Sequence, residues 1–114
     1  MDVITSLAVG LACQFTSAAL DGRAPFASRY AMTFEGGPTT AVVRSDDDPD
    51  RRFRVDQRGI WTTFTGLDPN VLGRTTVVDI GEDGWASLVI RQTSGAPKII
   101  AREGNCQPLA PKDQ

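Results

Sequence analysis

The chain has 114 residues and contains no histidine. It therefore lacks the imidazole that most often activates a nucleophile, binds catalytic zinc or titrates near neutral pH. Acid and base chemistry would have to rest on carboxylates, lysine, tyrosine or cysteine. The sequence also lacks a glycine-rich phosphate loop followed by a helix. We expect a protein that is not an enzyme and that holds no cofactor and no metal ion.

Cysteine is scarce too, with Cys13 near the start of the chain and Cys106 near its end. Two cysteines without histidine do not make up the usual ligand set of a zinc site, so a disulfide is the better use of the pair. A disulfide indicates an oxidising compartment, and we expect a periplasmic or secreted protein. The alternative is a cytoplasmic protein with two free thiols.

No charge of one sign dominates the sequence. The 12 lysines and arginines are scattered and stand against 14 acids, which gives a net charge of −2. Nucleic acid is not an expected partner, because binding it requires a basic stripe or patch. The acidic run Asp46–Asp50 has the oxygen atoms that calcium needs, but it lacks the glycine and the closing glutamate of an EF-hand loop. It is expected to be a solvated turn.

No apolar run is long enough to cross a bilayer, which takes about 20 residues. The run Val3–Ala12 has the length of a signal-peptide core, but it follows Asp2 where a signal peptide carries a positive charge. Its apolar residues also recur at helical spacing. Residues 1–9 are therefore expected to be either the remnant of a signal segment or a short helix, and no membrane span is expected.

Turn signals divide the rest of the chain into short segments that alternate between apolar and polar residues or are rich in β-branched side chains. The clearest turn is Gly81–Gly84, whereas residues 17–28 are expected to form a loop. The pair Gly104–Asn105 is expected to break the last strand, and residues 107–114 to form a flexible tail. The predicted strands cover residues 10–17, 29–35, 39–44, 52–56, 60–65, 75–80, 85–92 and 98–102.

About eight strands joined by short turns predict one all-β domain over residues 1–114, an antiparallel up-and-down meander that closes into a barrel. A two-sheet β-sandwich is the alternative. In a barrel the first and last strands become neighbours, so a bond between Cys13 and Cys106 would hold the closure. A barrel of this size is either filled by side chains or holds one small ligand.

The candidate contact residues are mostly aromatic. An aromatic-lined barrel mouth is a reasonable site for a small apolar ligand, although the same side chains are also typical of a core. Trp61 lies on the strand face opposite Thr62 and Phe64, and an outward Trp61 would mark a contact surface. The residues expected to contact a ligand or a partner are Trp61, Phe64, Trp85, Tyr30 and Arg54.

These observations lead to three hypotheses of function. The first is a non-catalytic β-domain of periplasmic or secreted type that binds a partner protein or a small ligand. The second is a structural subunit of a larger assembly, which an exposed Trp61 would favour. The third is a hydrolase that uses carboxylates alone, such as Glu35 or Asp56 paired with another acid about 5–10 Å away.

Overall fold

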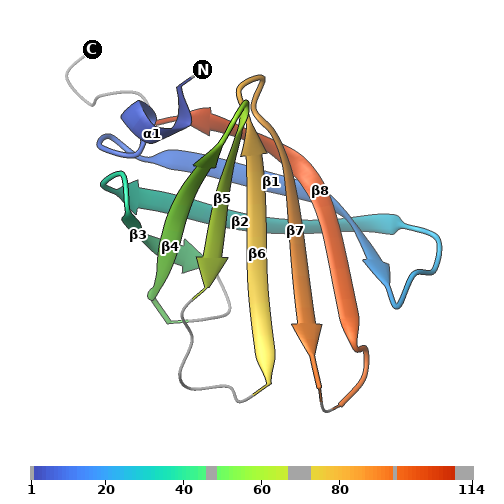
Figure 1. Ribbon diagram of the computed structural model, residues 1–114. Coiled ribbons are helices and arrows are strands. Elements are labelled where there is room, and N and C mark those ends of the chain that lie inside the picture. Colours follow the sequence, from blue (N-terminus) through green and yellow to red (C-terminus); the bar gives the residue numbers. More distant parts are fainter. Residues whose placement is uncertain (1, 46–48, 67–72, 94, 110–114) are drawn as a thin grey trace.

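The computed structural model describes residues 2–45, 49–66, 73–93 and 95–109, and its strands form one closed antiparallel barrel (Figure 1). Each strand pairs with the next one along the chain, and the last pairs with the first. The up-and-down barrel is therefore confirmed over the sandwich. The elements are α1 (Val3–Ser6), β1 (Leu11–Leu20), β2 (Phe26–Gly36), β3 (Thr40–Ser45), β4 (Arg51–Arg58), β5 (Trp61–Gly66), β6 (Arg74–Gly81), β7 (Trp85–Gln92) and β8 (Ile99–Pro108).

The barrel closes along β1 and β8, where the predicted disulfide forms. Cys13 and Cys106 are direct partners in the β1–β8 ladder, with their Cα atoms 4.0 Å apart. Both side chains are buried in the core, so the covalent bond lies inside the barrel wall and away from solvent. This position is compatible with an oxidising compartment.

Side chains fill the middle of the barrel. Every second residue of a strand points inward, and four phenylalanines at such positions are fully buried, namely Phe15, Phe34, Phe53 and Phe64. The ring of Phe34 lies 4.8 Å from that of Phe64 and meets Phe53 edge to face at 6.5 Å. Because aromatic rings occupy this space, the larger hollows among the described residues lie at the barrel ends and on the outer wall.

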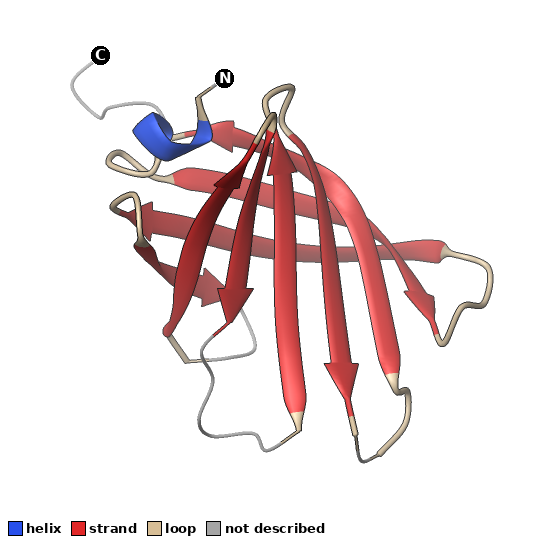
Figure 2. Cartoon of the chain, in the orientation of Figure 1, coloured by secondary structure: helices blue, strands red, loops and turns tan. Residues whose placement is uncertain are grey.

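The N-terminal segment forms the predicted short helix, which covers one end of the barrel (Figures 1 and 2). Asp2 caps it, since its carboxylate accepts hydrogen bonds from the backbone nitrogen of Thr5 at 3.3 Å and from the hydroxyl of Thr5 at 2.9 Å. Val3 and Leu7 are buried in the core, so α1 is a plug of that end. No helix of the described chain is long and apolar enough to cross a membrane.

Two predicted boundaries were wrong. The expected loop over residues 17–28 is shorter, because β1 continues to Leu20 and β2 begins at Phe26. The expected break at Gly104 is absent, and β8 runs on to Pro108, so the strand includes the start of the predicted tail. A Cβ at Gly104 would overlap the carbonyl of Gln14 and lie 2.6 Å from the Cα of Phe15. This glycine allows two strands to approach each other closely instead of ending one.

The remaining loop predictions lie outside the described residues. They are residues 46–48 of the acidic turn and the end of the predicted tail from residue 110 onward.

The disulfide is expected to contribute strongly to stability. Its sequence separation is 93 residues, and closing a loop of this size in the unfolded chain corresponds to about 4–5 kcal/mol in the chain-entropy model. Reducing the wild-type protein should lower its free energy of unfolding by that amount, measured by urea denaturation. The reduced protein is the best comparison because it keeps both sulfur atoms in the core. A Cys13→Ala, Cys106→Ala variant whose unfolding midpoint did not change on adding reductant would be the matched control. Equal midpoints for oxidised and reduced wild type would contradict the expectation.

Candidate functional site

The structure brings together two of the five predicted contact residues. Trp61 and Trp85 lie on the outer wall of the barrel with their ring centroids 5.5 Å apart and their planes at 76°. Phe64 is fully buried in the core, and Tyr30 is a partly buried inward residue 6.5 Å from Phe15. Arg54 lies elsewhere on the outer wall, where its Nε donates to Asp56 at 3.0 Å. The candidate site is therefore the Trp61–Trp85 pair with the residues around it.

A glycine makes the tryptophan pair possible. Gly81 is the ladder partner of Trp61 on β6, and β7 with Trp85 lies on the other side of β6. A Cβ at Gly81 would lie 3.1 Å from Cζ3 of Trp61, which is tighter than ordinary van der Waals contact. Because β6 has no side chain at this point, the two indoles meet across it edge to face, an arrangement that aromatic rings favour.

Polar side chains surround the pair. They enclose a shallow hollow of about 280 Å³ on the outer wall. The hydroxyl of Thr63 donates to Oδ1 of Asp79 at 2.6 Å, which fixes the carboxylate at the side of the hollow. Arg58, the ladder partner of Trp61, lies on the opposite side. The residues lining this Trp61–Trp85 site are Arg58, Trp61, Thr63, Asp79, Trp85 and Ser87.

Hydrogen bonds within and between two hairpin turns hold the site in place. The backbone nitrogen of Trp85 donates to Oδ1 of Asp83 at 2.9 Å, which locks the tryptophan to the β6–β7 turn. The backbone nitrogen of Glu82 in the same turn donates to the carbonyl of Ile60 at 3.2 Å, in the β4–β5 turn. Ile60 is 58% exposed and Trp85 is 36% exposed. The exposed apolar side chains therefore belong to two hairpin turns that hydrogen bonds hold together.

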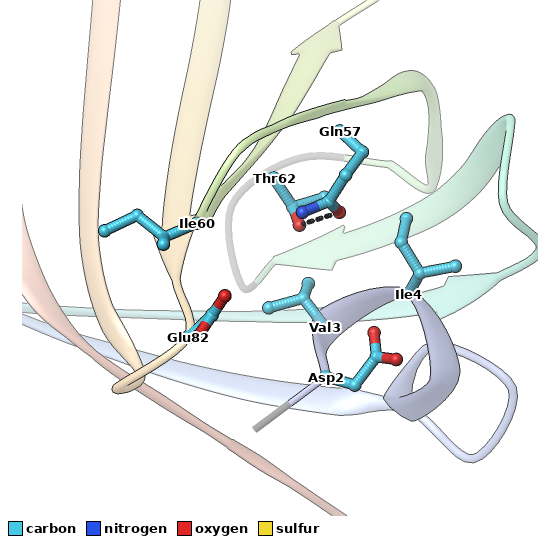
Figure 3. Close-up of a pocket in the computed structure, with 7 residues that line it drawn as sticks. All are labelled: Asp2, Val3, Ile4, Gln57, Ile60, Thr62 and Glu82. Atoms are coloured by element: carbon cyan, nitrogen blue, oxygen red, sulfur yellow. Dashed lines mark hydrogen bonds between the residues drawn. The ribbon is translucent and has the colours of Figure 1, made fainter.

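A second hollow opens beside this site at the α1 end of the barrel. It has a volume of about 520 Å³ and lies between α1, the β4–β5 hairpin and the β6–β7 turn (Figure 3). Inside it the amide of Gln57 links the carbonyl of Gly59 to the hydroxyl of Thr62, with both hydrogen bonds at 2.8 Å. The hydrogen bonds from Thr5 lower the pKa of Asp2. An acid held in its ionised form as a helix cap is unsuited to donate a proton.

The carboxylates proposed for a hydrolase are paired with arginine. Glu35 lies 3.6 Å from Arg44, and Asp56 lies 3.0 Å from Arg54, all on the exposed outer wall. Arg44 also contacts Asp50 at 3.0 Å. Asp56 and Asp79 are the two ladder partners of Thr63, so these two carboxylates stand in one row on the outer wall. Among the described residues no group of three or more acids, cysteines and histidines could hold a metal ion.

Sequence reasoning found the two tryptophans but missed Gly81 and Asp79. The alternation of β5 already indicated that Trp61 and Thr63 point to the same side. The contact of Thr63 with Asp79, however, depends on the register between β5 and β6. Gly81 was assigned only to a turn, and its role in leaving space for an indole requires the position of the neighbouring strand.

Replacing Gly81 with alanine should disturb the tryptophan pair without unfolding the barrel. The added methyl group displaces the Trp61 ring, so we expect an altered near-ultraviolet circular dichroism spectrum and a loss of about 1–2 kcal/mol of stability from overpacking. Gly37→Ala is the matched control, because nothing lies within 4 Å of a Cβ at Gly37. If Gly81→Ala and Gly37→Ala gave the same spectrum as the wild type, the close packing at Gly81 would be disproved.

Comparison with known proteins adds no identification. No protein-family model, curated protein or solved structure gives a significant match to this chain. The chemistry of the Trp61–Trp85 site is therefore the basis for a proposed function.

Proposed function

We propose that the protein is a non-catalytic binding domain of periplasmic or secreted type, which holds a basic segment of a partner protein at the Trp61–Trp85 site. The observation that supports this proposal most directly is the pair of indoles packed edge to face beside the carboxylate of Asp79. The buried disulfide supports the compartment, because such bonds persist where the environment is oxidising.

The shape of the site favours a protein segment over an enclosed small molecule. The hollow is shallow, and it lies on the outer wall, whereas the middle of the barrel is filled by phenylalanine rings. The exposed Ile60 at the neighbouring hairpin tip adds apolar surface beside the pair. Tryptophan and arginine are the residues that most often dominate binding energy in protein interfaces, and here Trp61, Trp85 and Arg58 lie together. Such preformed aromatic surfaces lose little conformational entropy on binding.

The charges around the site indicate the chemistry of the partner. Asp79 lies within the hollow, Glu82 and Asp83 lie in the adjacent turn, and Glu103 is the ladder partner of Ser87. Arg58 is the one cationic side chain that lines the hollow among the described residues. A lysine or arginine of the partner would be attracted to the face of an indole and to the carboxylate of Asp79 at the same time. A basic segment therefore fits the site better than an acidic one.

The site can be tested with a random peptide library selected against the oxidised protein. We expect the bound peptides to be enriched in lysine and arginine. Binding should change the intrinsic fluorescence, because the two tryptophans of the chain both lie in the site. Trp61→Ala and Asp79→Asn should each weaken binding about tenfold, in the range expected when a central interface contact is lost.

Ile99→Ala is the matched control for these variants, since Ile99 is 38% exposed but belongs to the start of β8, at the other end of the barrel. It should bind the peptides as the wild type does. Selected peptides without basic residues, or peptides whose affinity does not depend on Trp61 and Asp79, would refute the proposal.

A further inference from the structure

The inner wall carries arginines at the barrel end opposite α1, where β4, β6 and β8 begin (Figure 1). Arg51 and Arg74 stand two residues before the buried Phe53 and Thr76, and Arg102 is the ladder partner of the buried Leu88. Because side chains of a strand alternate between its two faces, all three arginines occupy inward positions. They come from three different strands and lie toward the same end of the barrel.

The contacts of the arginines agree with this placement. The guanidinium carbon of Arg51 lies 5.3 Å from the centre of the Phe53 ring. That of Arg102 lies 4.8 Å from the centre of the Tyr30 ring, and its Nη1 donates to the hydroxyl of Ser28 at 3.0 Å. Both guanidinium groups therefore stack on aromatic rings that belong to the inner wall.

Gly66 on β5 leaves space for a side chain of β4 to meet a side chain of β6. A Cβ at Gly66 would lie 3.2 Å from Cζ of Phe53 and 3.4 Å from Cβ of Thr76, so these two side chains meet over β5. Arg51 and Arg74 each stand two residues closer to the end of the barrel than Phe53 and Thr76. Arg51 and Arg74 therefore lie in the same row across the sheet, and both occupy inward positions of the barrel.

The inward positions of the described strand residues carry positive charge only. Among the described residues of the eight strands, the inward positions hold these three arginines and no aspartate or glutamate. The acids of the strands point outward, as Asp79 does beside Thr63 and Glu103 does opposite Ser87. Arg51 makes further contacts of its own, but Nε of Arg74 is buried and has no hydrogen-bond partner in the part of the chain that the structure describes. A buried cationic donor in this state costs free energy unless an acceptor reaches it.

We propose that this end of the barrel binds the anionic head, a carboxylate or a phosphate, of a small ligand, with Arg74 and Arg102 as its main partners. Guanidinium groups match the oxygen geometry of both head groups through paired hydrogen bonds. The fully buried Phe64 and Val78 close the barrel beneath, so the head enters and the rest of the ligand stays outside.

A neighbouring hollow could hold an apolar body attached to that head. It has a volume of about 550 Å³ between the β1–β2 and β7–β8 loops. Its lining combines apolar and charged residues, namely Leu20, Phe26, Pro97, Asp21 and Arg23. Leu20 is the ladder partner of Ile100, two residues from Arg102 on β8. Phe26 is 50% exposed, which leaves apolar surface beside the arginines.

Titration calorimetry with three probes tests the proposal, namely dodecanoate, dodecanol and inorganic phosphate. Dodecanoate should bind more tightly than dodecanol, and added salt should weaken it, because the head group carries the charge. Binding of phosphate alone would show that the head suffices. Binding of dodecanoate without phosphate would show that the apolar body contributes as well. Equal binding of dodecanol and dodecanoate, or no binding of either anion, would refute the proposal.

Arg74→Gln and Arg102→Gln should each weaken binding of the anion about tenfold. Arg54→Gln is the matched control, since Arg54 is an exposed arginine of the outer wall, paired with Asp56. A second measurement covers loss of folding: the bound anion should raise the melting temperature of the wild type more than that of Arg74→Gln. Equal increases would overturn the assignment. Peptide binding at the Trp61–Trp85 site should not change in either variant, so the two sites fail independently.

Discussion

The pairing of β1 with β8 is the constraint on which the rest of the structure depends. Until these strands meet, the meander has two free edges, and its inner face is not enclosed. The buried Cys13–Cys106 bond lies within this pairing, so the covalent link and the apolar core act at the same place. Gly104, two residues away on β8, allows the backbones of β1 and β8 to touch. A larger residue there would separate the strands beside the disulfide.

Closure with a packed interior decides where binding can occur. Phe15, Phe34, Phe53 and Phe64 occupy the middle of the barrel, so its centre is a core. Contact surfaces are then limited to outward residues and to the strand ends. The outer wall provides the Trp61–Trp85 site, which needs rigid hairpins to keep two large indoles at the surface. In many barrels of this size the interior is the binding site, whereas both sites proposed for this protein lie at the rim and on the wall.

The sequence was sufficient to predict the strands, the barrel and the disulfide, because alternation and turn residues are local signals and two cysteines leave one pairing. The errors concern features that depend on neighbouring strands. Gly104 resembles a strand breaker in sequence, yet it is a point of close approach in space. Gly81 was assigned to a turn, and its space for Trp61 appears only once β5 and β6 are in register. The inward arginines were also missed, since Arg51, Arg74 and Arg102 are far apart in sequence and converge only through closure.

The two ends of the barrel are built differently, and the difference bears on stability. At one end Val3 of α1 and Leu7, which follows α1, are buried in the core. At the other end Nε of Arg74 is a buried donor that no described residue accepts from, and such a donor costs about 1–3 kcal/mol in proteins generally. The disulfide, worth about 4–5 kcal/mol in the chain-entropy model, is large enough to offset such a cost. The covalent closure of β1 and β8 therefore allows the opposite strand ends to carry the inward arginines of the proposed anion site.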